Sequence, residues 1–161
     1  MSHINKNMAY NFSPKKPVKS FQDLEVYQKL LEASVFVAKN ILPALLKVKK
    51  NQKPDLTKEL IYKAIAPCAL GLPHLIAEAH SVRFGSQTEC IVFLEKVMLN
   101  CNKMAVYLEQ VRDICDTGIE WEVFDELIKK YFYTRRKVLH LQMSWKKYMN
   151  QNNETRQIKS N

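Results

Sequence analysis

The stretch QTECIVFLEKVMLNCNKMAVYLEQVRDI, residues 87–114, decides the fold, because apolar residues recur along it every three or four positions. They are Cys90/Ile91, Leu94, Val97/Met98, Cys101, Ala105, Leu108 and Val111/Arg112. This spacing matches the period of an α-helix and places the apolar residues on one face. The sequence therefore predicts a long amphipathic helix that needs other helices to cover it.

A helix of the same kind is predicted to begin before this stretch, at residue 20. Ser20 is the expected N-cap, and Asp23 follows three residues later as a capping-box partner. The predicted apolar stripe consists of Leu24, Tyr27, Leu31, Ser34/Val35 and Ala38. Pro43 is expected to kink this helix or to end it, because proline cannot donate a backbone hydrogen bond.

A second helix is predicted over roughly residues 56–83, after a lysine-rich loop that ends at Pro54. Its centre, APCALGLPHLIAEAH at 66–80, contains Pro67, Gly71 and Pro73. Each proline removes the donor for the carbonyl four residues earlier, so local kinks are expected.

The last helix is predicted over about residues 120–149. Its expected inner face is formed by Phe124, Leu127/Ile128, Tyr131, Val138, Leu141/Gln142, Trp145 and Tyr148. The chain has three glycines and no Asn-Gly turn, which argues against a β fold. We predict an all-α protein, an antiparallel up-down-up-down four-helix bundle with a kinked second helix at 20–149. A flexible basic arm at 1–19 and a disordered polar tail at 150–161 are expected to flank it.

Chemistry of an enzyme is not indicated. The four cysteines, Cys68, Cys90, Cys101 and Cys115, form no CxxC pair, so reduced and buried thiols are expected. Cys68, His74 and His80 are spaced by six residues, which does not align them on one helix face for a metal. No glycine-rich phosphate loop occurs, and we predict no catalytic residue, cofactor or metal site, with an enzyme as the third hypothesis.

The N-terminus lacks the apolar core of a signal peptide, and no apolar run long enough for a membrane span is evident. We therefore expect a cytoplasmic protein that is not embedded in a membrane.

The distribution of charge along the chain says more about function than the enzyme and targeting motifs do. The chain has 25 Lys and Arg residues against 16 Asp and Glu residues, a net charge of +9. Seven cations and no acid lie between residues 127 and 148: Lys129, Lys130, Arg135, Arg136, Lys137, Lys146 and Lys147. The acids of this helix, Glu120, Glu122, Asp125 and Glu126, all lie in its first turns. The helix dipole favours this order, but its effect fades within one turn, whereas the basic run covers about six.

Tyr131, Phe132, Tyr133 and Trp145 are interleaved with these cations, although most of them are expected in the core. Cations that neutralise phosphates, next to aromatic rings, are typical of RNA-binding surfaces. We predict contact with RNA or another nucleic acid through the seven cations. Secondary basic candidates are Lys47, Lys49, Lys50 and Arg83. A solvated basic face, and contact with a membrane or an acidic protein, remain as alternatives.

Four segments resemble a known family: FQDLEVYQK at 21–29, LTKELIYKAIA at 56–66, LPHLIAEAHSVR at 72–83 and ECIVFLEKV at 89–97. They look like the bacterial four-helix-bundle proteins encoded in intervening sequences of 23S ribosomal RNA genes. That family is similar to the accessory variability determinants of diversity-generating retroelements. The matching residues are Phe21, Asp23, Leu24, Tyr27, Gln28 and Lys29, then Pro73, Ile76, Ala77 and Glu78. Ala79 and Leu75 replace the glycine and asparagine usual in the family.

The resemblance implies a non-enzymatic bundle that assembles as a homopentamer. In the retroelement branch it implies binding to a reverse transcriptase and its RNA, in support of mutagenic copying of a template. Our prediction is a homo-oligomeric RNA-binding accessory protein. The alternative is a ribosome-associated or structural protein-interaction bundle that does not bind nucleic acid directly.

Overall fold

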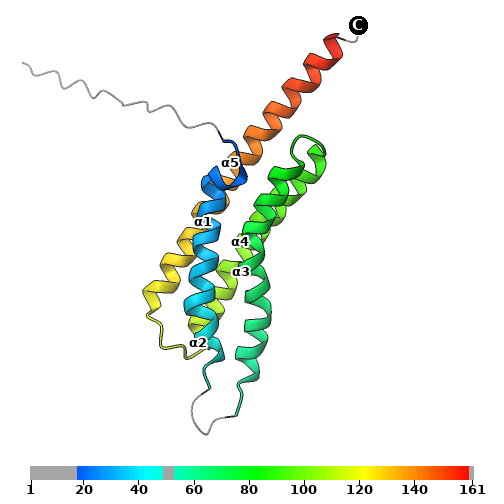
Figure 1. Cartoon of the computed structure of the whole chain (residues 1–161). Helices are drawn as coiled ribbons and strands as arrows, with labels where there is room; N and C mark the ends of the chain where they lie inside the picture. The colour runs from blue at the N-terminus through cyan, green and yellow to red at the C-terminus, as the bar shows by residue number, and fades with distance from the viewer. Residues whose placement is uncertain (1–17, 49–52, 160–161) are drawn as a thin grey trace, which may run out of the picture.

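The computed structural model describes residues 18–48 and 53–159 of the chain. Most of the predicted N-terminal arm, together with Lys49 and Lys50, lies outside these residues. Four helical rods form the described protein (Figure 1). The first rod consists of α1 (Glu25–Phe36), the π-helical turn η2 (Val37–Ile41) and α2 (Leu42–Leu46). The others are α3 (Leu56–Val82), α4 (Gln87–Ile114) and α5 (Trp121–Lys159).

The rods alternate in direction along the bundle, as Figure 1 shows. Helix α3 packs against α1 and α4, and α5 packs against α4 and α1, which closes the ring of neighbours. Short connections at 83–86 and 115–120 join α3 to α4 and α4 to α5, and short connections favour antiparallel neighbours. The predicted up-down-up-down four-helix bundle is confirmed.

The capping box at Ser20 forms as predicted, but it starts a short turn and not the long helix. The Ser20 hydroxyl accepts a hydrogen bond from the Gln22 backbone at 3.1 Å, and the Asp23 carboxylate accepts one from the Ser20 backbone at 3.0 Å. These bonds hold the 3-10 turn η1 (Phe21–Asp23). Leu24 then takes an extended conformation and α1 begins at Glu25.

The inner face of the first rod is shifted from the predicted stripe. The buried residues are Leu24, Val26, Leu30, Ala33, Ser34, Val37 and Ile41. Leu31 and Val35, which were placed in the stripe, are exposed. The prediction was wrong there because this helix carries apolar residues on more than one face, so periodicity alone does not select the face that α3 and α5 cover.

Pro43 neither breaks the first rod nor starts a loop. It lies in the first turn of α2, directly after the π-helical turn, where the Leu42 backbone donates to the Val37 carbonyl. A wider turn before a proline accommodates the missing donor while the chain stays helical.

Helix α3 runs without interruption from Leu56 to Val82 through both prolines. Pro73 is buried, whereas Pro67 is on the exposed side. By length and composition α3 could cross a membrane, contrary to our expectation for this chain. The central helix of a bundle passes the same test, and α3 packs against α1 and α4.

Helix α5 is longer than predicted. Its 39 residues continue to Lys159, so residues 150–159 extend the helix where a disordered tail was expected. No proline or glycine follows Gly118, and amide and charged residues are compatible with a helix. The end of α5 therefore projects past the turn between α3 and α4 (Figure 1).

Candidate nucleic-acid interface

The seven predicted cations of α5 fall into three groups around the helix. The α5 residues that enter the core include Phe124, Tyr131, Val138 and Gln142, which defines the inner side. Given 100° per residue, Lys129, Arg136 and Lys147 lie opposite the core, Lys130 and Lys137 lie on the α1 side, and Arg135 and Lys146 lie on the α4 side. The structure therefore does not place all seven on one surface.

The cations on the α1 side are paired with acids of α1. The Lys130 ammonium lies 2.9 Å from a Glu32 carboxylate oxygen, and the Lys137 ammonium lies 3.6 Å from Glu25. The hydrogen bond from Lys130 lowers the pKa of Glu32, and the Tyr133 hydroxyl together with Glu25 raises the pKa of Lys137. These two lysines are partly neutralised within the protein.

The outward basic residues form a row that we call the cation stripe: the cations Lys129, Arg136 and Lys147, with the imidazole of His140 between the last two. Successive members are separated by seven, four and seven residues, so they share one side of the helix. All four are exposed. Lys129 pairs with Glu126 at 3.1 Å, whereas Arg136 and Lys147 form no ion pair within residues 18–48 and 53–159. The cation stripe is about 27 Å long at 1.5 Å per residue.

The two cations on the α4 side differ in accessibility. Arg135 is half-buried and lies near Cys101 of α4. Its Nε is buried without a hydrogen-bond partner in the described part of the chain. Lys146 is exposed beside it.

No acid interrupts the cation stripe. Between residues 127 and 153 α5 has no Asp or Glu, and Asp125, just before this region, is held by Arg112 at 3.0 Å. Arg112 also contacts Asp113 at 2.7 Å, so acidic and basic side chains at this end of the bundle are paired with each other. On the outer side of α5, Arg136 and Lys147 therefore have no acidic partner in the described part of the chain, whereas Lys129 is paired with Glu126.

The interleaved aromatic rings are divided between core and surface. Tyr131 is buried and Trp145 is half-buried, but Phe132 and Tyr133 are exposed. The expectation that most of these rings belong to the core is therefore only half right. Tyr148, predicted on the inner face, is also exposed, whereas the next residue, Met149, is buried, so Tyr148 lies to one side of the covered face.

Arg83, a secondary candidate, lies next to the C-terminal half of α5. Its guanidinium lies 4.2 Å from the centre of the Phe84 ring and 5.9 Å from that of Trp145. It donates a hydrogen bond to the His80 carbonyl at 3.0 Å, and burial lowers its pKa. The structure thus brings Arg83 next to Trp145, on the inner side of α5, and not next to the outward Lys147.

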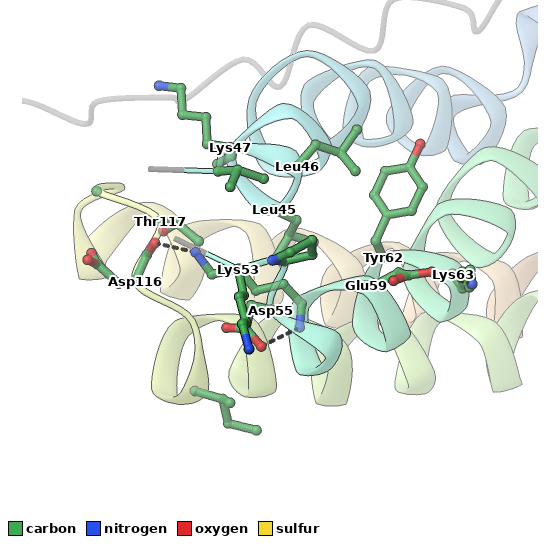
Figure 2. A pocket seen from close by; sticks show the side chains of 16 residues that line it. Leu45, Leu46, Lys47, Lys53, Asp55, Glu59, Tyr62, Lys63, Asp116 and Thr117 are labelled. Atoms are coloured by element: carbon green, nitrogen blue, oxygen red, sulfur yellow. Dashed lines mark hydrogen bonds and ion pairs between the residues drawn. The ribbon is translucent and has the colours of Figure 1, made fainter. Parts of the chain in front are cut away.

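Lys47 lies at the other end of the bundle, in the cavity shown in Figure 2. This cavity of about 970 Å³ is formed by α2, the start of α3 and the α4–α5 connection. Its lining includes Lys47 and Lys53 as well as Asp55 and Glu59, and Lys58 donates to the Asp116 carbonyl at 3.0 Å. The mixed charges do not favour an anion there, and Lys47 is separate from the cation stripe.

The cysteines are free thiols, and Cys90, Cys101 and Cys115 are buried as predicted. Burial raises the pKa of Cys90 to about 11 and that of Cys101 to about 12, which keeps both protonated near neutral pH. Within the described residues no group of three or more His, Cys, Asp and Glu could hold a metal ion.

Sequence periodicity missed two features of this surface. Phe84 stands in a turn, where no helical pattern points to it, and the residues after 149 were placed in the tail. The continued spacing of Trp145, Tyr148 and Asn152 along one side of α5 was the available signal.

Comparisons with protein-family models, with curated proteins and with solved structures found no match to the chain. The coordinates show an all-α protein whose four helices pack in sequence as an up-down bundle.

Proposed function

We propose that the protein is a non-enzymatic, homo-oligomeric RNA-binding accessory protein, and that RNA lies along the cation stripe of α5. The observation that carries this proposal is the row of exposed Lys129, Arg136, His140 and Lys147, with no acid on α5 between residues 127 and 153. When Lys and Arg side chains neutralise the phosphates of a nucleic acid, the counterions condensed on it are released, and this release favours binding.

The helix dipole gives a weaker account of this charge. Cations are favoured within the last turn of a helix, but α5 ends at Lys159, about three turns after Lys147 and about eight after Lys129. Surface ion pairing accounts for Lys129, Lys130 and Lys137, which have acidic partners, but not for Arg136 and Lys147. An external polyanion accounts for the outer side of α5 more fully.

The partner class follows from the resemblance of the sequence to the retroelement accessory proteins and their relatives from ribosomal RNA genes. It suggests a reverse transcriptase as the protein partner, a template RNA as the nucleic acid, and a homopentamer as the assembly. The order of events would be binding of RNA to α5, followed by presentation of that RNA to the polymerase.

The proposal is tested by reversing two charges of the cation stripe. We expect Arg136→Glu with Lys147→Glu to weaken binding of a fluorescein-labelled single-stranded RNA by roughly 10- to 100-fold, because phosphate contacts are replaced by repulsion. Fluorescence anisotropy at physiological salt measures the affinity, and circular dichroism checks that the helices remain.

The matched control is Lys96→Glu with Lys103→Glu. Both lysines are exposed on the outer side of α4, and the change in net charge is the same. Equal losses of affinity in the two double variants, or no loss in the α5 variant, contradict RNA binding along the cation stripe.

A second candidate function is protein interaction without nucleic acid. Val92, Leu99 and Val106 recur every seven residues on the outer side of α4 and are 41%, 53% and 50% exposed. A seven-residue apolar repeat is typical of a helix that packs against another helix, either of a partner protein or of a second copy. A protein partner retained after nuclease treatment, with no RNA affinity in the purified chain, favours this candidate over the first.

A further inference from the structure

A second cavity lies where α5 leaves the bundle. It has a volume of about 1090 Å³ and is formed by the α3–α4 turn, the first residues of α4 and the C-terminal part of α5. Residues from three parts of the chain line it, among them Arg83, Phe84, Gln87, Tyr148 and Asn152. It lies next to Trp145, on the inner side of α5 and at the level of Lys147, the last member of the cation stripe.

The cavity exists because α5 is longer than its neighbours. The inner side of α5 passes through Val138, Gln142, Trp145 and Met149, and it continues to Asn152 beyond the α3–α4 turn. There no helix covers it, and its side chains change from apolar to amide. The amide of Asn152 lies on the side of α5 that is apolar further back along the helix. A ligand that covers this amide must supply hydrogen-bond partners for it, so a polar ligand is favoured.

Two exposed aromatic faces and a cation are available in the cavity. Phe84 is 75% exposed and Tyr148 is 56% exposed, so both rings can be reached by a ligand. The Arg83 guanidinium stacks on the Phe84 ring at 4.2 Å, so its charge is fixed beside the ring.

Apart from Arg83, the polar lining is neutral and can both donate and accept hydrogen bonds. Gln87, Asn152 and Asn153 contribute amides, and Ser86, Thr88 and Thr155 contribute hydroxyls. No Asp or Glu is among the lining residues that the structure describes. Amide groups match the donor and acceptor pattern of base edges, and aromatic rings match base faces.

We infer that this cavity binds an unpaired nucleobase of an RNA strand that runs along the cation stripe. The inference rests on the proposed function, since it adds a base site to the same RNA-binding surface. Lys147 precedes Tyr148 on α5 and lies about 100° from it around the helix, so a strand that leaves the outer side after Lys147 can turn over Tyr148 into the cavity without crossing an acid. Stacking on Phe84 and Tyr148 requires a base that is free of its complement.

The test compares single-stranded with fully paired RNA of the same sequence and length. We expect Phe84→Leu and Tyr148→Leu each to weaken binding of the single strand roughly tenfold, as for loss of one base stack, with no change for the duplex. Both side chains are exposed, so the variants should fold. Trp121→Leu, at an exposed ring before the first member of the cation stripe and outside the cavity lining, is the matched control and should leave both affinities unchanged.

Tryptophan fluorescence gives an independent readout, because the chain has two tryptophans and Trp145 lines the cavity. In Trp121→Phe, the single-stranded RNA should quench Trp145, whereas the duplex should bind without quenching. If the wild type binds RNA but neither cavity variant affects the single strand selectively, the base site is wrong and the cation stripe stands. If the wild type binds neither RNA at physiological salt, both proposals are overturned.

Discussion

The hydroxyl of Tyr131 lies in the core with no hydrogen-bond partner in the described part of the chain. Its side chain is 1% exposed, and burial raises its pKa far above the ordinary value for tyrosine. A buried hydroxyl that makes no hydrogen bond loses its hydration without compensation. The ring therefore contributes packing, while the hydroxyl opposes folding.

We predict that Tyr131→Phe raises the free energy of unfolding by about 1 kcal/mol, since it removes the unsatisfied hydroxyl and keeps the ring. Urea denaturation followed by circular dichroism measures the change. The control Phe124→Leu, at another buried ring, should lower the free energy of unfolding by about 1 kcal/mol or more. A loss of stability in Tyr131→Phe would show that the hydroxyl has a partner.

Single residues also show what sequence periodicity can assign. It placed Leu94, Cys101 and Leu108 correctly, because one face of that helix is apolar and the other is polar. It misplaced Leu31 and Tyr148. A period identifies residues that share a side of a helix, but only the neighbouring helices decide whether that side is covered.

At the scale of elements, α3 contains Gly71 without an evident need for glycine. A Cβ built at Gly71 meets nothing within 4 Å, and the helix passes through this position unbroken. Gly118, in the α4–α5 connection, has a φ of 68°, a conformation that side chains disfavour. Only Gly118 therefore has a backbone conformation that requires glycine, whereas the helix at Gly71 could accept a larger residue.

We predict opposite effects of the same substitution at these sites. Gly71→Ala should raise the free energy of unfolding by about 0.5–1 kcal/mol, because alanine loses less conformational entropy in a helix. Gly118→Ala should lower it by about 1 kcal/mol through backbone strain. Thermal denaturation of both variants is the measurement. A destabilised Gly71→Ala would mean that another chain packs closely against this side of α3.

Helix ends and breaks were the least predictable elements. The sequence indicates α3 and α4 nearly to their ends, because capping residues and turns mark them. It does not predict the π-helical turn before Pro43 or the extension of α5 to Lys159. Both features depend on backbone hydrogen bonds, which many different sequences can form. A polar segment that follows a stable helix can continue it, because only the first turn of a helix carries the cost of nucleation.

At the scale of the whole molecule, charge follows the architecture. Acids of α1 neutralise the cations on one flank of α5, and Arg112 neutralises acids at the start of α5. Arg136 and Lys147 remain without an acidic partner in the described part of the chain on the outer side of α5, and an open cavity lies near its C-terminal end. The basic run was evident in the sequence, but its division into three groups required the positions of α1 and α4.

The measurement that tests the central claim most directly is the salt dependence of RNA binding. We compare the wild type with a variant in which Lys129, Arg136 and Lys147 are all replaced by Gln, using single-stranded RNA and a series of salt concentrations. Each phosphate contact contributes about 0.7 to the slope of log K against log salt for single strands, so the variant should lose about 2 units of slope. An equal slope in the two proteins would contradict RNA binding along the cation stripe.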